Sequence, residues 1–343
     1  MRRFKGPVLH GAAVVVAGAL AYSTWHKKEE PVKQQTYEVE VWRGSPDNVS
    51  RISFDSPGRK VLLEARKDET GRFFVGTVDR EASPPPKGPP GARLKSEPEP
   101  TGVSKRETVR FVAVSEAQKL AESVAPLKAL RRIGRVDNKR ASEFGLDKPE
   151  GTMKIQIGDN QHVLVIGSAA PGGGDRYAKE MGTGETYAIS TEVANRVMYA
   201  ETRLLERNLH GWENDRVKRV EVARGQKKRE LVPVEGKLGG WGDASTPTKL
   251  DETAGNWMSK LGRVHVADYT EAPPGGLGPA DLVVRVDYFE KSRSKSIGFV
   301  EIFRKGTDKE REYYGRTEHT RWPFKVLKSV GEQIDQDLPS VVR

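Results

Sequence analysis

The chain has 343 residues, of which 36% are hydrophobic and 31% are charged, and this balance excludes a disordered chain and a protein with many membrane spans. It contains no cysteine, which excludes structural disulfides and thiolate metal sites. The formal net charge of +10 favours acidic partners such as nucleic acid, anionic lipid, acidic glycans or acidic proteins, although a solvated basic surface also accounts for it.

The first segment along the chain, residues 7–25, is the one whose composition suits lipid. Its sequence, PVLHGAAVVVAGALAYSTW, carries no formal charge when His10 is neutral. As a helix it has about the length of a bilayer core, which is roughly 30 Å thick, because each helical residue adds about 1.5 Å. We therefore predict a transmembrane anchor. The triplet Ala19-Leu20-Ala21 suits a signal peptidase, so a cleaved signal segment is the alternative, and a buried soluble helix is a third.

The basic residues before this segment give its orientation. Arg2, Arg3 and Lys5 precede it, so the positive-inside rule places residues 1–6 in the cytoplasm. Residues 26–36 are then a linker, and the rest of the chain is expected in the periplasm. The prediction is a single-pass protein of the cytoplasmic (inner) membrane whose C-terminal domain lies outside the cytoplasm.

Short runs with period-two alternation follow and predict strands. The turn residues Asp68 to Gly71 predict a hairpin between two of these runs. Residues 81–108 contain SPPPKGPPG and EPEPTG, and proline cannot donate to a strand ladder, so we predict an extended insertion. A proline motif that binds a partner is the alternative. The predicted strands cover residues 37–42, 49–54, 60–65, 73–78 and 108–114.

A helix is predicted after the last of these strands. Ser115-Glu116-Ala117-Gln118 has the form of a capping box, in which the Ser and Gln side chains bond to free backbone amides. Pro126 should break or restart the helix, since proline lacks the amide hydrogen. Apolar residues recur at three- and four-residue spacing, at Ala117, Leu120, Val124, Leu127 and Leu130.

Six basic residues lie at or beyond the end of this predicted helix, and they are the candidate interaction surface: Lys128, Arg131, Arg132, Arg135, Lys139 and Arg140. The carbonyl groups at a helix C-terminus favour cations, which is a sufficient structural explanation. The functional interpretation is a docking surface for an acidic partner protein, a lipid head group or an envelope glycan.

The two halves of the chain show the same order of predicted elements, namely two strands, a Gly-aromatic turn, a helix, a strand meander and a closing helix. The turns are Gly71-Arg72-Phe73 in the first half and Gly239-Gly240-Trp241 in the second. The predicted fold class is α+β, with a tandem duplicated unit of small antiparallel sheets, each covered by a helix, after one transmembrane helix. The first unit covers residues 37–207, and the second covers residues 208–343.

One stretch of the chain resembles a known family. It runs from FGLDKP through IGSAAPGGGDRYAKEMGTGETYAIS to RNLHGWENDRVKRVEV and WMSKLGRVHVADY. It is similar to the domain-of-unknown-function 4340 family in Gly145 to Pro149, Ile166-Gly167, Tyr177 and the predicted helix at 192–206. The resemblance covers roughly residues 49–269, and more loosely the remainder. The proline-rich insertion and several basic substitutions depart from the pattern of the family.

The resemblance implies an N-terminal transmembrane helix and an extracytoplasmic domain. Members of the family often sit beside gliding-motility-type ABC transporter components, which implies an accessory or scaffolding role. No catalytic residues are established for the family, so none is carried over to this chain.

Motifs for catalysis or cofactor binding are absent from the sequence. The triple glycine at 172–174 precedes RYAKEM, which reads as a strand, so we predict a hairpin turn and not a phosphate loop. There is no GxSxG elbow and no aromatic interleaving of the type that binds single-stranded nucleic acid. No histidine has a paired metal-ligand spacing, at His10, His26, His162, His210, His265 or His319.

From these observations we expect a membrane-anchored, extracytoplasmic and non-catalytic accessory or scaffold protein. We expect it to bind partners of an ABC-type transporter or of an envelope or motility machine. No catalytic residue, cofactor, metal, nucleic acid or small-molecule substrate is predicted. Two alternatives stay open: a periplasmic binding module for an anionic envelope glycan or lipid, and an enzyme without a recognisable motif.

Overall fold

The computed structural model describes residues 38–81, 106–270, 275–290, 295–307 and 310–342. The predicted cytoplasmic residues, the anchor or signal segment at 7–25 and the linker therefore lie outside the described residues, as does most of the proline-rich insertion. Among the described residues, no helix is both long and apolar enough to cross a membrane. Residues 38–343 form one compact unit.

The described residues are mostly β with few helices, and their strands form three antiparallel sheets of two, nine and seven strands. This confirms the predicted α+β class. The two-stranded sheet pairs β1 with β6, and its strands are β1 (Val39–Trp42) and β6 (Leu127–Ala129).

The nine-stranded sheet is built from the first half of the chain. Its strands are β2 (Val49–Ser56), β3 (Arg59–Asp68), β4 (Gly71–Glu81), β5 (Arg106–Ala113), β7 (Arg131–Arg135), β8 (Gly151–Ile157), β9 (Asn160–Ala169), β10 (Asp175–Glu180) and β11 (Glu185–Ser190). They are arranged in the order β5-β4-β3-β2-β8-β9-β10-β11-β7. The helices of this half are η1 (Pro46–Asn48), α2 (Ser115–Val124), η2 (Ala141–Phe144), α3 (Thr191–Met198) and α4 (Ala200–Arg203).

The seven-stranded sheet is built from the second half. Its strands are β12 (Arg219–Arg224), β13 (Lys227–Pro233), β14 (Trp241–Asp243), β15 (Leu282–Phe289), β16 (Gly298–Lys305), β17 (Glu312–Thr317) and β18 (Phe324–Val326). They are arranged in the order β14-β13-β12-β15-β16-β17-β18. The helices of this half are η3 (Asn214–Arg216), α5 (Glu252–Leu261), η4 (Pro279–Asp281) and α6 (Lys328–Val341).

Seven neighbouring strands of the larger sheet, β4-β3-β2-β8-β9-β10-β11, follow the same order as the seven strands of the smaller one. The short helix η1 precedes β2 and η3 precedes the matching strand β12, and η2 precedes β8 as η4 precedes β15. The larger sheet carries β5 and β7 in addition, one at each edge. Both sheets are larger than predicted. The reason is that β2 pairs with β3 and β8, and β12 pairs with β13 and β15, so each hairpin joins its meander in one sheet.

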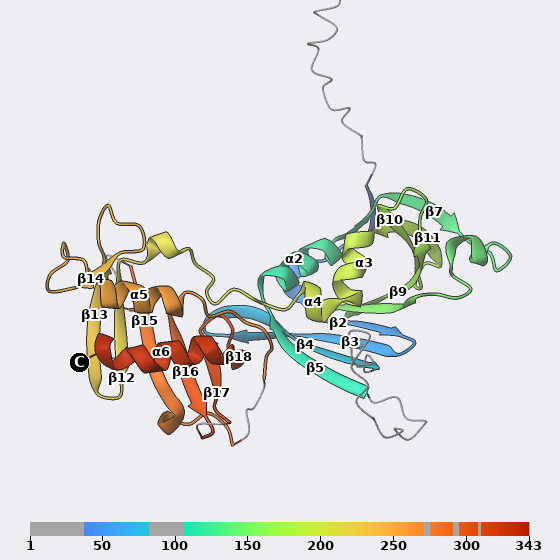
Figure 1. Cartoon of the computed structure of the whole chain (residues 1–343). Helices are drawn as coiled ribbons and strands as arrows, with labels where there is room; N and C mark the ends of the chain where they lie inside the picture. Colours follow the sequence, from blue (N-terminus) through green and yellow to red (C-terminus); the bar gives the residue numbers. More distant parts are fainter. Residues whose placement is uncertain (1–37, 82–105, 271–274, 291–294, 308–309, 343) are drawn as a thin grey trace, which may run out of the picture. The chain divides into compact units, whose positions relative to one another are not determined.

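Each large sheet has its own buried core against its helices. The first core joins α2, α3 and α4 to the nine-stranded sheet, and it contains Phe54 and Leu120. The second core joins α5 and α6 to the seven-stranded sheet, and Figure 1 shows these two helices side by side across that sheet. Within this core, Trp257 Nε1 donates to the Ile334 carbonyl over 3.0 Å, which ties α5 to α6.

Several predicted elements are confirmed, and one local prediction is wrong. The β3–β4 hairpin forms where expected, and the Asp68 carboxylate accepts bonds from the amides of its turn. The capping box does not form: the residue before α2 is Val114, and the Ser115 amide instead donates to the distant Glu206 Oε2 over 3.0 Å. The helix ends at Val124, so the apolar residues beyond Pro126 belong to β6 and its continuation.

Candidate functional site

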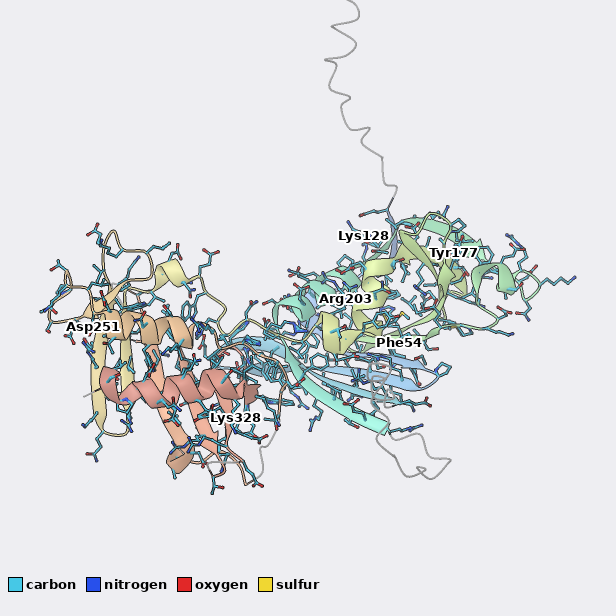
Figure 2. All side chains as sticks on the ribbon, in the orientation of Figure 1. Phe54, Lys128, Tyr177, Arg203, Asp251 and Lys328 are labelled. Atoms are coloured by element: carbon cyan, nitrogen blue, oxygen red, sulfur yellow. The ribbon has the colours of Figure 1, made fainter. Side chains whose placement is uncertain are left out.

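The six basic candidates lie on strands and a turn, so their explanation by a helix C-terminus is wrong. Helix α2 ends before all of them. Lys128, which Figure 2 labels, is on β6, three arginines are on β7, and the remaining two residues lie in the turn before η2. All six side chains are exposed. We call this set the basic rim, and it consists of Lys128, Arg131, Arg132, Arg135, Lys139 and Arg140.

The basic rim follows an edge of the nine-stranded sheet. Within the described residues β7 pairs only with β11, so its other side is open. Successive strand residues point to opposite faces, so Arg131 and Arg132 project on either side of this edge. The pairing is irregular near Gly134, which has a φ of 95°. Like charges and an irregular strand hinder edge-to-edge pairing between two copies of a chain.

Three cations of the rim have carboxylate partners. Lys128 lies 3.0 Å from Glu38 Oε2, and Arg140 lies 3.0 Å from Glu143 Oε2. Arg132 bonds to Glu185, and its guanidinium holds the pKa of that carboxyl below its usual value.

The other three cations of the rim form no ion pair with a carboxylate among the described residues. The side chains of Arg131 and Lys139 make no hydrogen bond or ion pair with any residue that the structure describes. Arg135 contributes to lowering the pKa of Glu185 through its charge alone. Because the paired cations are also about half exposed, their ion pairs are weak and can be exchanged for other anions. The rim can therefore bind an extended anionic surface.

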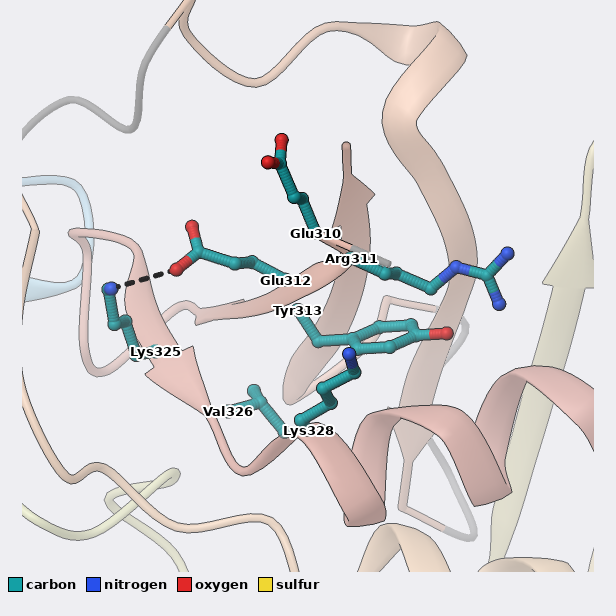
Figure 3. Close-up of a pocket in the computed structure, with 7 residues that line it drawn as sticks. All are labelled: Glu310, Arg311, Glu312, Tyr313, Lys325, Val326 and Lys328. Atoms are coloured by element: carbon teal, nitrogen blue, oxygen red, sulfur yellow. Dashed lines mark hydrogen bonds and ion pairs between the residues drawn. The ribbon is translucent and has the colours of Figure 1, made fainter. Parts of the chain in front are cut away.

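A hollow of about 540 Å³ lies beside the start of α6 (Figure 3). Lys325 Nζ bonds to Glu312 Oε1 over 3.1 Å, and bonds from Tyr314 and Lys325 lower the pKa of Glu312. Burial and a bond to Asp335 raise the pKa of Tyr313 to about 12. Neither group exchanges protons near neutral pH, as a general acid or base must. The hollow is lined by Glu310, Arg311, Glu312, Tyr313, Lys325, Val326 and Lys328.

Three of the histidines in the described residues, His162, His210 and His319, pack against aromatic rings or lie near carboxylates, whereas Nδ1 of the exposed His265 lies 3.1 Å from the Arg263 carbonyl oxygen. His162 stacks on Trp42 with ring centroids 4.3 Å apart. His210 stacks on Trp212, and its Nδ1 lies 2.9 Å from Glu318 Oε1. Within the part of the chain that the structure describes, no group of three or more His, Asp or Glu side chains could hold a metal ion. His10 and His26 lie outside that part.

One buried carboxylate was not singled out from the sequence. Glu206 is 4% exposed, and it accepts bonds from the amides of Ser115 and Asn208, each over 3.0 Å. Its Oε2 also lies 3.4 Å from His319 Nε2. Burial alone would raise the pKa of Glu206, but His319 and the two amides lower it to about 2. Glu206 therefore replaces the predicted capping box as the acceptor at the first turn of α2.

The comparison with protein families identifies the middle part of the chain. Residues 112–281 match the family model described as Domain of unknown function (DUF4340). The chain contains a DUF4340 domain. This confirms the family predicted from the sequence. No curated protein and no solved structure matches the chain.

The DUF4340 match begins in β5 and ends in η4. It starts later than the predicted resemblance at 49–269, so β2, β3 and β4 lie outside the match. It also ends later, at residue 281. The whole basic rim lies within the DUF4340 match. Of the seven-stranded sheet, only β12, β13 and β14 are included.

A second surface lies largely beyond the DUF4340 match, on the seven-stranded sheet. The core under α5 and α6 takes Val284, Val286, Val300 and Ile302 from β15 and β16. Because side chains alternate along a strand, the residues between them face away from these helices. We call this side of the sheet the Arg–Phe face, and it consists of Arg219, Arg285, Asp287, Phe289, Phe299, Glu301 and Arg316 together with the buried Phe303 and Tyr314.

Arginines cover the aromatic rings of the Arg–Phe face. The guanidinium of Arg219 lies 4.0 Å from the centre of the Phe289 ring, and that of Arg285 lies 4.3 Å from the centre of the Phe299 ring. Such contacts are cation–π interactions. The guanidinium of Arg316 lies 5.5 Å from the centre of the Phe303 ring.

Carboxylates hold these arginines in place. Glu301 is only 6% exposed, and its two oxygens accept bonds from Arg285 over 2.8 Å and from Arg316 over 2.7 Å. Asp287 accepts two further bonds from Arg285, over 2.8 and 2.9 Å. Period-two alternation in LVVRVDYF and GFVEIF was the sequence signal that could have identified this face.

Proposed function

We propose that the protein is a membrane-anchored, extracytoplasmic and non-catalytic accessory or scaffold protein. Residues 7–25 anchor it in the cytoplasmic membrane, and it binds a partner protein of an ABC-type transporter or of an envelope or motility machine. The observation that carries the proposal is the Arg–Phe face, where half-buried aromatic rings lie under partly exposed arginines on the sheet surface opposite the helices.

The composition of this face supports a protein partner. Interface cores are enriched in aromatic residues and arginine, and the side chains that dominate binding energy come largely from these types. The arginines are already oriented by Glu301 and Asp287, so little side-chain entropy is lost when a partner binds. Since carboxylates balance much of the positive charge here, the partner need not be strongly acidic.

The matching strand order of the two large sheets supports a duplicated α+β unit. In a duplicated chain, one copy can keep the shared architecture while the other gains a separate surface. Here the basic rim belongs to the first copy, and the Arg–Phe face belongs to the second. We infer that the two copies have different partners.

The test is recovery of partners with the intact protein from detergent-solubilised membranes. The double variant Phe289→Ala/Phe299→Ala removes two half-buried rings and should reduce recovery of the partner by at least about tenfold, as expected for central interface residues. The matched control is Arg224→Ala/Lys227→Ala, which alters exposed residues at the β12–β13 turn of the same sheet and should leave recovery unchanged.

Equal recovery with the aromatic variant and the control would contradict a role for the Arg–Phe face. Recovery of the wild-type protein alone, in repeated preparations, would contradict the accessory function itself. Circular dichroism of both variants checks that neither change has unfolded the sheet.

A further inference from the structure

We propose that the basic rim rests on the anionic lipid head groups of the membrane that anchors the chain, and that this contact fixes the orientation of the domain. The inference deepens the proposed function and rests on its membrane anchor. According to this inference the basic rim contacts lipid, whereas the Arg–Phe face contacts a protein partner.

The first support is the position at which the chain enters the fold. Glu38 immediately precedes β1, and its carboxylate lies 3.0 Å from the Lys128 ammonium of the rim. Strand β1 then pairs with β6, with Val39 opposite Ala129. Strand β7 begins two residues after β6 ends. The segment that leads from the predicted anchor therefore joins the domain next to the basic rim.

The second support is the short reach of that segment. Twelve residues, 26–37, separate the end of the predicted span from Glu38. A chain of twelve residues bridges at most about 45 Å when it is fully extended. The rim is thus held at a high effective concentration near the bilayer surface, where even weak contacts become occupied.

The third support is charge. Four carboxylates bond to the cations of the rim, at Glu38, Asp137, Glu143 and Glu185, and Glu40 lies opposite Lys128 on β1, so the rim keeps a small net positive charge. Each Lys or Arg near an anionic membrane strengthens binding by about fivefold. Arg131 and Lys139, which have no ion pair within the described residues, are available for this contact without losing another one.

The shape of the rim favours lipid over an acidic protein strand. Its side chains project on both sides of an edge, and the irregular pairing at Gly134 interrupts the regular spacing that an added strand would need. A fluid layer of head groups adapts to such an edge. Binding of an acidic protein is therefore the alternative that the experiment must separate.

The experiment uses the absence of cysteine in the chain. Asn138→Cys places one label beside Lys139, and the full-length protein is reconstituted without other proteins in vesicles that carry a head-group quencher. One set of vesicles contains phosphatidylcholine alone, and the other contains about a third phosphatidylglycerol. We expect strong quenching only in the anionic vesicles, with loss of quenching in about 0.5 M salt because surface charges are then screened.

Two triple variants, each of which replaces three basic residues by glutamate, complete the test. Arg131→Glu/Arg135→Glu/Lys139→Glu should reduce quenching to the level seen with phosphatidylcholine alone. The matched control, Arg224→Glu/Lys227→Glu/Lys237→Glu, reverses three exposed cations of the other sheet and should retain it.

The outcomes separate this inference from the proposed function. If the protein floats with both kinds of vesicle but the label is quenched equally in each, or in neither, the lipid contact is wrong while the anchor stands. If the protein floats with neither kind, the anchor itself is wrong. Quenching that the rim variant leaves intact, or that appears only when a protein partner is added, also overturns the lipid contact.

Discussion

The two large sheets share a strand order but differ at their edges and on their outer faces. The nine-stranded sheet has the extra edge strands β5 and β7, and β7 carries much of the basic rim. The seven-stranded sheet has neither, but it carries the Arg–Phe face opposite its helices. The difference teaches that two sheets with a common strand order can offer different surfaces, in one case through an added edge strand and in the other through the outward-facing residues of the shared strands.

The largest expected effect is in the helix layer of the seven-stranded sheet. Trp257→Ala removes a ring that is 1% exposed together with its bond to the Ile334 carbonyl. We expect the free energy of unfolding to fall by about 3–5 kcal/mol, because a large cavity replaces the ring. Urea denaturation followed by fluorescence and circular dichroism measures this. Leu120→Ala is the matched change in the helix layer of the other sheet and should cost about 2–5 kcal/mol. A loss below 1 kcal/mol for either variant would contradict the described cores.

The next effect concerns Glu206, which has no counterpart at the start of α5, where Asp251 caps the helix locally. Glu206→Gln should lower the free energy of unfolding at pH 7 by about 2 kcal/mol, because the carboxylate is stabilised in the folded state. The folded-state pKa of about 2 lies below the unfolded value of 4.5, so this stability is complete above pH 4.5 and is lost as the pH falls toward 2. Denaturation of both proteins between pH 2 and 7 measures it, and parallel pH profiles would show that Glu206 is not the responsible group.

A smaller pair of effects compares one motif that occurs in both sheets. Gly76 lies opposite Phe111 on the neighbouring strand, and Gly315 lies opposite Phe324. A Cβ atom would lie 2.2 Å from the ring at Gly76 and 2.4 Å from the ring at Gly315. Each Gly→Ala change should therefore cost about 1–3 kcal/mol, as expected when a packed core is overfilled.

Gly174→Ala is the control for this pair, since a Cβ atom there meets nothing within 4 Å. Thermal unfolding of the three variants provides the measurement. If only one of the two variants at Gly76 and Gly315 unfolds at a lower temperature, the two glycine–phenylalanine pairs are not packed equally tightly.

The smallest effect contrasts the two surfaces. Arg316→Ala deprives the buried Glu301 of one of its two arginines and should cost about 1–2 kcal/mol. Arg132→Ala on the basic rim removes an exposed ion pair and should leave the free energy of unfolding nearly unchanged. Chemical denaturation at low and high salt measures both. A larger loss for Arg132 would contradict the view that the rim is free to exchange its partners.

Local pattern was sufficient to predict most strands. Alternation in VSRISF and MKIQIG predicted β2 and β8, and the turn at Asp68 predicted the β3–β4 hairpin. The spacing of apolar residues could not predict that β2 pairs with β8, because that pairing depends on which distant strand packs best beside β2. The repeated order of elements was visible in the sequence, but the size of the sheets was not.

The sequence identified the residues of the basic rim but not the elements that carry them. The six cations were identified correctly as exposed, yet a helix end was the wrong explanation, because Pro126 ends the helix early and the chain continues as an edge strand. Glu206 was missed because its three partners come from different parts of the chain. The Arg–Phe face was missed because the sequence does not show which side of the strands faces the helices, and the sheet places Phe299 on the opposite side.

The most direct test of the account compares the two surfaces in the native membrane. A photo-crosslinking amino acid is placed at Phe299 on the Arg–Phe face in one protein and at Asn138 beside the basic rim in another. We predict that the group at position 299 crosslinks to a partner protein, and that the group at position 138 crosslinks to phospholipid. Protein adducts at position 138 together with none at position 299 would contradict the account.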